Sequence, residues 1–160
     1  MAADYFLLID GVAGESQDAK HKGWIDVMGW SWGEAHAGSH PPGSGGGAGK
    51  LTFHDFAFTT HVSKASPALF LACATGQHYK EAKLTARKAG KGQQEFLAWT
   101  FSDVLVTSYQ TSGTEGDEAP LDSVSLNFSK AQISYRPQKP DGSLDAPISA
   151  GFDVKTNTKV

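Results

Sequence analysis

The chain has 160 residues, enough for one domain, and a domain of this length buries roughly 70% of the surface that its unfolded chain exposes. Its net charge is −3 and its lysines and arginines are scattered, which argues against nucleic acid as a partner because the basic stripe that attracts phosphates is missing. The single cysteine, Cys73, excludes an internal disulfide, and no apolar stretch reaches the roughly 18 to 20 residues of a membrane-spanning helix, so membrane insertion is not expected.

The first residues, MAADYFLLIDG, have the length and apolar character of a strand. Asp4 precedes the apolar run and no basic segment comes before it, so no secretory signal peptide is predicted. With one unpaired cysteine, the expected compartment is the reducing cytoplasm.

Segments rich in β-branched and aromatic residues alternate with clusters of Gly, Pro, Asn, Asp and Ser, the pattern of an antiparallel β domain with about seven or eight strands. The predicted strands span Asp4 to Asp10, Gly23 to Glu34, Lys50 to Thr60, His78 to Lys88, Gln94 to Tyr109, Asp122 to Tyr135, and one or two segments between Ile148 and Val160.

The alternation of apolar residues slips by one position in three of these strands. In the fifth, Leu97, Trp99 and Phe101 share one face, and the pattern then shifts to Val104, which predicts a bulge near Ser102 and Asp103. Repeated slips of this kind suit strands that bend around a small barrel.

One helix is predicted in SPALFLACATG, with Ser66 as the N-cap, Pro67 at the first helical position and Gly76 just past the end. The helix is apolar nearly all round, so more than one of its faces should be covered. It either plugs the barrel or serves an interface. The predicted fold is therefore mainly β, a small antiparallel two-sheet β-barrel with one short flanking α-helix, in a single domain covering residues 1–160.

Two motifs suggest chemistry, but the context of each argues against it. Gly29 to Gly33 reads G-W-S-W-G, which matches the G-x-S-x-G nucleophile elbow around Ser31, but no helix signal follows it. The glycine run ending at Lys50 resembles a phosphate-binding loop, but Ser44 replaces its first glycine and a strand follows it. We therefore expect no catalytic residue and no nucleotide cofactor.

The histidines and tryptophans leave weaker alternatives. None of the six histidines forms a pair at metal-ligand spacing, so no metal site is predicted. Trp24, Trp30 and Trp32 share the parity of one strand face and could form a stacking platform in a β-barrel binding module, although burial against a neighbour is the commoner fate of such residues.

Several segments together resemble the Hcp family, the haemolysin-coregulated proteins that form the inner tube of bacterial type VI secretion systems. The resemblance covers essentially the whole chain and rests on the order and spacing of DYFLLIDGVAGESQDAKHKGWIDVMGWSWG, GGGAGKLTFHDF, SPALFLACATGQHYKEAKLTARKAG, EFLAWTFSDVLVTSY and DSVSLNFSKAQISYRPQKPDG.

This resemblance implies a non-enzymatic subunit that forms hexameric rings, which stack into a tube inside a contractile sheath. The tube carries a spike trimer at its tip and secreted effectors in its lumen, and it is assembled in the cytoplasm and then expelled from the cell. The resemblance places Ser31 on a strand facing the lumen. It also assigns ring stacking to the long loop formed by His40, Pro41, Pro42, Gly43, Ser44, Gly45, Gly46, Gly47, Ala48, Gly49 and Lys50.

Overall fold

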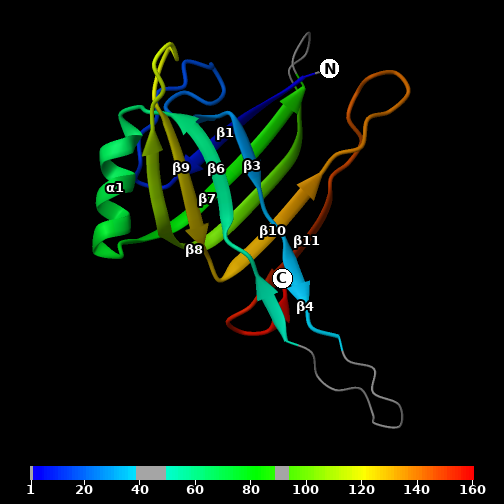
Figure 1. Cartoon of the computed structure of the whole chain (residues 1–160). Coiled ribbons are helices and arrows are strands. Elements are labelled where there is room, and N and C mark those ends of the chain that lie inside the picture. Colours follow the sequence, from blue (N-terminus) through cyan, green and yellow to red (C-terminus); the bar gives the residue numbers. More distant parts are fainter. Residues whose placement is uncertain (1, 39–49, 89–93) are drawn as a thin grey trace.

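The computed structural model describes residues 2–38, 50–88 and 94–160 (Figure 1). Within these ranges it contains twelve strands and one helix. In chain order they are β1 (Ala3–Ile9), β2 (Ile25–Val27), β3 (Gly29–Ser31), β4 (Glu34–His36), β5 (Leu51–Phe53), β6 (Phe56–His61), α1 (Ala65–Thr75), β7 (His78–Lys88), β8 (Glu95–Ser112), β9 (Leu121–Asn127), β10 (Lys130–Tyr135), β11 (Ile148–Asp153) and β12 (Thr158–Lys159).

The strand pairings run in a circuit, and all of them are antiparallel. From β8 they pass through β9, β6 and β3 in one direction, and through β7, β1 and β2 in the other. Only Met28 separates β2 from β3, and its backbone N–H donates to the carbonyl oxygen of Thr59 on β6 at 2.8 Å. The sheet therefore curves back on itself, as the predicted antiparallel barrel requires.

Two parts of the chain extend beyond this circuit. The first half of β8 pairs with β10, which continues into β11 and β12, while the second half of β8 pairs with β9. The strands β4 and β5 form a separate two-stranded ribbon that projects from the body (Figure 1). The length of β8 follows from its two partners, because each half belongs to a different part of the sheet.

The core fills the space enclosed by the circuit and is rich in aromatic rings. Phe56 and Phe101 are both fully buried, and their ring centroids lie 5.0 Å apart. Phe128 packs against Phe101 with centroids 4.3 Å apart. Burial of these rings, together with the aliphatic residues of the core, stabilises the fold by about 25 cal/mol per Å² of apolar surface removed from water.

Three predicted strands are divided in the structure. The segment from Gly23 to Glu34 forms β2, β3 and β4, that from Lys50 to Thr60 forms β5 and β6, and that from Asp122 to Tyr135 forms β9 and β10. In the last two cases the slip in apolar alternation marks the place where one strand ends and the next takes a different partner.

The predicted bulge near Ser102 and Asp103 is wrong in its position. The register between β7 and β8 is unchanged there, since Tyr79 lies opposite Val104 and Glu81 opposite Ser102. Asp103 instead adopts a left-handed conformation with φ of 57°. This conformation turns the following side chains to the other face of the strand without inserting an extra residue. The register of β8 shifts instead at two other places, one before this point, opposite Ala86 and Arg87 on β7, and one after it, between Val106 and Ser108 beside β9.

Helix α1 lies against the outside of the barrel and begins earlier than predicted (Figure 1). Its N-cap is Lys64 rather than Ser66. The hydroxyl of Ser63 accepts the Ala65 N–H at 3.2 Å and the hydroxyl of Ser66 accepts the Ser63 N–H at 3.0 Å, so one donor of the first turn and one just before the helix are satisfied reciprocally. The predicted end is confirmed, because Gly76 is the C-cap with φ of 71°.

A buried carboxylate fastens α1 to the sheet. Asp122 on β9 is fully buried and accepts hydrogen bonds from the hydroxyl of Ser66 at 2.5 Å and from that of Tyr109 at 3.0 Å. Burial, followed by the hydrogen bond to Asp122, raises the pKa of Tyr109 above its usual value. The inner side of the helix is thereby fixed, with Leu69 and Ala72 packed into the core.

A second polar cluster holds the segment between β1 and β2 against the barrel. The buried ring of His21 stacks on Phe6 with centroids 4.2 Å apart, and its two nitrogens contact Asp18, at 2.7 Å, and Glu95. Arg87 on β7 also contacts Asp18, at 2.7 Å. The Asp18 carboxylate is therefore enclosed by two partners that favour its charged form.

We expect this cluster to make stability depend on acid pH. The hydrogen bond from His21, followed by that from Arg87, lowers the pKa of Asp18 from 3.8 to about 2. Because the folded-state pKa lies below the unfolded value, the stabilisation is complete above pH 3.8 and is lost as the pH falls toward about 2. His21→Gln should return the pKa of Asp18 toward its usual value and make the loss of stability across this interval shallower. Urea unfolding at stepped pH measures that slope.

The matched control for this prediction is His78→Gln, because His78 is exposed and its side chain contacts Asp103, which is also exposed, at 3.1 Å. This control should leave the pH dependence of stability at its wild-type slope. Equal slopes for wild type and His21→Gln would contradict the prediction.

Candidate binding face

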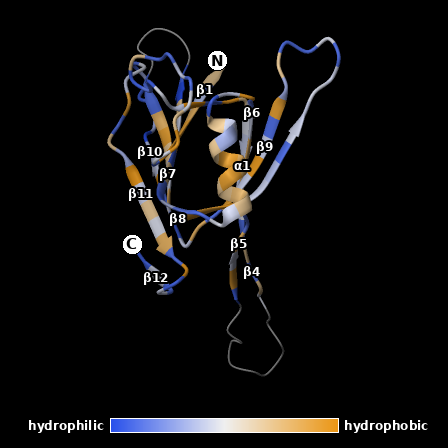
Figure 2. Ribbon diagram, turned by 90° about the vertical axis from the view of Figure 1, so that its left-hand side faces the viewer, coloured by the Kyte–Doolittle hydropathy of each residue, from blue (hydrophilic) through white to orange (hydrophobic). Residues whose placement is uncertain are grey.

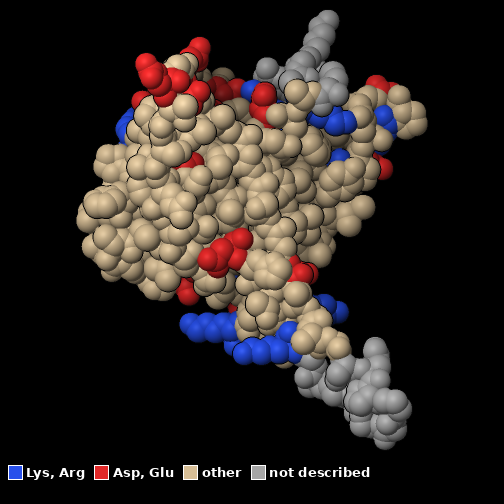
Figure 3. Space-filling model, viewed as in Figure 1, with Lys and Arg blue, Asp and Glu red and all other residues tan. Residues whose placement is uncertain are grey.

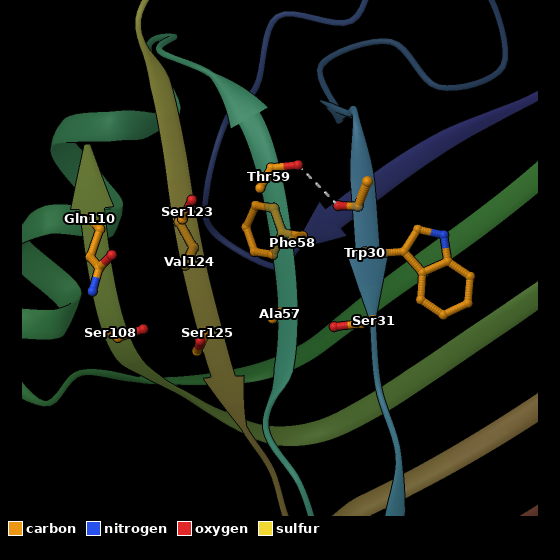
Figure 4. Close-up of a pocket in the computed structure, with 11 residues that line it drawn as sticks. Trp30, Ser31, Ala57, Phe58, Thr59, Ser108, Gln110, Ser123, Val124 and Ser125 are labelled. Carbon is orange, nitrogen blue, oxygen red and sulfur yellow. Dashed lines mark hydrogen bonds between the residues drawn. The ribbon is translucent and has the colours of Figure 1, made fainter. Parts of the chain in front are cut away.

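A shallow cavity of about 420 Å³ lies on the outer face of β3, β6, β9 and β8 (Figure 4). Its floor is formed by cross-strand neighbours in two rows. The first row consists of Ser31, Ala57, Ser125 and Ser108, and the second of Gly29, Thr59, Ser123 and Gln110. We call these eight residues the polar face.

Alternation along each strand places these small side chains outside and large ones inside. On β9, Val124 and Leu126 are buried in the core, whereas Ser123 and Ser125 point outward between them. On β6, Phe56 and Phe58 are buried and Ala57 and Thr59 are not. The outer surface therefore stays flat, because no side chain in the two rows is larger than glutamine.

The polar face offers hydrogen bonds without charge. Six of its eight side chains carry a hydroxyl or an amide, and none carries a charge. The nearby carboxylate of Asp55 is already engaged, since it accepts hydrogen bonds from Thr107 at 2.7 Å and from Asn127 at 3.0 Å. Such a surface can make many weak, neutral contacts but holds no charged group that would bind an ion tightly.

Ser31 lies in this polar face at the exposed end of β3. The strand pairs antiparallel with β6, and β4 follows it. A nucleophile elbow requires instead a strand that turns directly into a helix. The G-x-S-x-G match therefore does not mark a nucleophile elbow. Ser31 instead supplies a hydroxyl group to an uncharged surface.

The tryptophans do not form a shared stacking platform. Trp30 packs edge-on against Tyr5 at 5.9 Å, and its ring points away from the polar face (Figure 4). Trp32 packs against Trp99 at 5.0 Å, and its indole N–H donates to the carbonyl oxygen of His54 at 2.8 Å. Trp24 meets the ring of His21 edge-on at 4.8 Å. Each indole is engaged by a different neighbour, as expected for residues that pack.

The remaining sequence predictions concern metals, membranes and the long loop. Within residues 2–38, 50–88 and 94–160, no three His, Cys, Asp or Glu side chains are placed to hold a metal ion. The helix of this described part is too short to cross a membrane. Of the predicted stacking loop His40–Lys50, only Lys50 lies within the described residues; it is exposed, and its carbonyl oxygen accepts the Ala37 N–H at 3.2 Å.

Sequence analysis identified one residue of the polar face and missed the others. Ser31 was selected by resemblance, whereas Thr59, Ser108, Gln110, Ser123 and Ser125 were not. A signal for them exists in the alternation of small polar with large apolar residues in FAFTT and DSVSLN. That signal identifies an outward face, but it does not show that four strands place these residues side by side.

Comparison with known proteins points to one family. The family model described as "Type VI secretion system effector, Hcp" matches residues 6–135. The chain is 45% identical to Protein hcp1 of Pseudomonas aeruginosa over 99% of both chains. Among solved structures, Hcp1 from Salmonella typhimurium matches with a TM-score of 0.81 and 36% identity over 100% of both chains. A structure described as a type six secretion system protein matches with a TM-score of 0.93 and 31% identity, covering 99% of this chain and 100% of that one.

Proposed function

Because the chain belongs to the Hcp family of type VI secretion proteins, we propose that it is a structural subunit of the secretion tube. In this proposal copies of the chain assemble into hexameric rings, and the rings stack into a tube that is built in the bacterial cytoplasm. The tube is then expelled together with a spike trimer by a contractile sheath, and it carries effectors in its lumen. The chain itself performs no chemistry.

The observation that carries this proposal is the neutral character of the polar face. A channel that must hold and release different proteins needs a wall that forms weak contacts with many surfaces. The rows beginning with Ser31 and Gly29 provide hydroxyls and an amide without fixed charge, so no single charge pattern on a cargo is strongly preferred. We therefore assign the polar face to the lumen.

Stacking of rings is assigned to the β4–β5 ribbon and the residues that join its strands. The ribbon is a separate sheet, in which Glu34 lies opposite Phe53 and His36 opposite Leu51, and it projects from the body (Figure 1). A projecting ribbon can reach a neighbouring ring without disturbing the barrel. Loop residues His40–Gly49 belong to this proposal by resemblance and lie outside the described residues.

The proposal is tested first by the absolute mass of the purified chain. Light scattering behind a sizing column should give the mass of a ring rather than that of one 17.0 kDa chain, and negative-stain images should show annular particles. A single-chain mass at every concentration would overturn the tube proposal.

The position of the polar face in the ring can then be seen directly. In a Cys73→Ala background, a gold cluster attached to Ser31→Cys should appear inside the annulus in negative-stain images. Thr100→Cys is the matched control, because Thr100 lies on β8 beside a different cavity that shares no residue with the polar face. Its gold label should appear outside the central hole. Gold from Ser31→Cys on the outer rim would contradict the lumen assignment.

A further inference from the structure

The segment between β1 and β2 forms a loop that is fixed at its base. There the Gly14 N–H donates to the carbonyl oxygen of Gly23 at 2.8 Å, and the Ser16 N–H donates to that of Trp24 at 2.9 Å. The backbone hydrogen bonds that the structure shows for residues 17–22 also stay within the loop. We call residues 17–22 the tip. Because its backbone pairs only with its own loop, the tip is held to the barrel by side chains.

His21 is the central side chain of this attachment. It is 1% exposed, and its ring lies on that of Phe6 from β1. Its Nδ1 is 2.7 Å from a carboxylate oxygen of Asp18, within the tip itself. Its Nε2 contacts a carboxylate oxygen of Glu95 on β8 and lies 3.3 Å from the hydroxyl of Thr85 on β7. His21 therefore joins the tip to three strands of the barrel.

The two carboxylates decide which form of His21 fits this position. An ionised carboxylate only accepts hydrogen bonds, whereas a neutral imidazole has one N–H and one bare nitrogen. A neutral ring would thus turn a lone pair toward either Asp18 or Glu95. A protonated ring donates to both of them and offsets their charge. The arrangement of contacts is that of an imidazolium.

The other charged groups around His21 favour the same form. They come from the loop and from every strand packed against it: Asp4 on β1, Asp18 and Lys20 on the loop, Asp26 on β2, Arg87 on β7 and Glu95 on β8. Four of these groups are acidic and two are basic, so a proton on His21 reduces an excess of negative charge. Arg87 is already engaged, since it lies 2.7 Å from Asp18 and 3.5 Å from Asp4.

This end of the barrel is rich in charge compared with the rest of the visible surface. Figure 1 shows the loop at the end opposite the β4–β5 ribbon. In Figure 3, acidic and basic side chains lie together at that upper end, and few of either occur across the middle of the face. Figure 2 shows hydrophilic residues gathered near the N-terminus at the same end, whereas α1 is largely apolar. Contacts at this end therefore depend on ionisation.

We propose that His21 is a proton-dependent latch that holds the tip on the barrel. While it is protonated, the ring bridges Asp18 and Glu95. When the pH rises and the ring loses a proton, one carboxylate loses its donor and the tip is released from β8. The hydrogen bonds at the base of the loop remain, so the barrel stays folded.

The latch opens toward alkaline pH, which is the opposite direction from the loss of stability that Asp18 causes at acid pH. Its opening would expose Phe6 and Thr85, which are now 5% and 0% exposed, and would change the surface at this end of the barrel. The inference goes beyond the tube function and does not depend on it.

Hydrogen–deuterium exchange of the wild-type chain, read by mass spectrometry, tests the latch. The peptide covering residues 15–24 is compared at about pH 6 and about pH 9, on either side of the range in which histidine ordinarily titrates, after correction for intrinsic exchange rates. Its protection should fall at least about tenfold at the higher pH, because a hydrogen bond between charged groups is lost. A peptide from β9 should keep its protection, since the barrel stays folded.

Two variants should change this response in opposite ways. His21→Gln has no charged donor, so the tip should have low protection at both pH values. Glu95→Gln provides an amide that can accept from the protonated ring and donate to the bare nitrogen of the neutral ring, so the tip should stay protected at both. His78→Gln, at an exposed histidine, is the matched control and should respond as the wild type does.

Three results would overturn the latch. Equal protection of the wild-type tip at both pH values would show that no proton controls it. A Glu95→Gln chain that loses protection as the wild type does would show that the Nε2 contact is not the point of release. Loss of protection in the β9 peptide together with the tip would show that the whole barrel opens. The mass of the ring is measured separately, so each of these results leaves the tube function standing.

Discussion

Phe101→Ala should lower the free energy of unfolding by about 4 kcal/mol, a loss at the upper end of the range for a buried side chain. Phe101 is fully buried on β8, and its ring meets those of Phe128 at 4.3 Å, Phe56 at 5.0 Å and Trp32 at 6.0 Å. Truncation removes the transfer free energy of the ring and leaves a cavity that three stiff aromatic neighbours cannot fill. Urea unfolding followed by tryptophan fluorescence measures the loss.

The matched variant is Phe101→Leu, which keeps most of the apolar volume and should cost about 1 kcal/mol. All variants should be compared at one chain concentration, because assembly adds a concentration-dependent term to apparent stability. A loss below about 1.5 kcal/mol for Phe101→Ala would mean that the core closes around the vacancy, against the packing described here.

Gly14→Ala should lower the free energy of unfolding by about 3 kcal/mol, because a methyl group has no space at this position. A Cβ on Gly14 would lie 2.3 Å from the carbonyl oxygen of Trp24 and 2.7 Å from the backbone nitrogen of Ile25. The backbone N–H of Gly14 also donates to the carbonyl oxygen of Gly23 at 2.8 Å. Relief of the clash must therefore move the entry into β2, which pairs with β1 in the circuit.

Gly33→Ala provides the control for this prediction. A Cβ at Gly33 would meet Nδ1 of His54 at 3.5 Å, an ordinary contact, so this variant should stay within about 0.5 kcal/mol of wild type. Thermal unfolding of the two variants should separate them clearly. Equal stability of Gly14→Ala and Gly33→Ala would show that the segment between β1 and β2 adjusts without cost.

The sequence predicted the elements better than their ends. Segments rich in β-branched and aromatic residues, separated by clusters of turn residues, identified most of the strands, because both signals are local properties of the sequence. Gly76 correctly marked the end of α1. Glycine has no Cβ and adopts the left-handed conformation of a helix C-cap without strain, and this preference depends on the residue alone. Ser66 was predicted as the N-cap, but its hydroxyl instead donates to Asp122, which is 56 residues away along the chain.

The division of strands was decided by tertiary structure. A strand ends where its partner ends, and the partner of β6 is β9 on one side and β3 on the other. The break after Phe53 separates a strand paired only with β4 from one inside the barrel circuit. The local sequence shows where the apolar alternation slips, but it does not show which strands pair with each other. A bulge and the end of a strand therefore give the same signal in the sequence.

By itself, then, the sequence determined the class of fold, the presence of one apolar helix and the family, because these depend on composition, periodicity and the order of motifs along the chain. Tertiary structure decided which outward residues become neighbours. Ser31, Ala57, Ser125 and Ser108 form one row only because four strands from three regions of the chain pair in a fixed register. The reason is that strand pairing, and not distance along the sequence, sets which side chains are neighbours across a sheet.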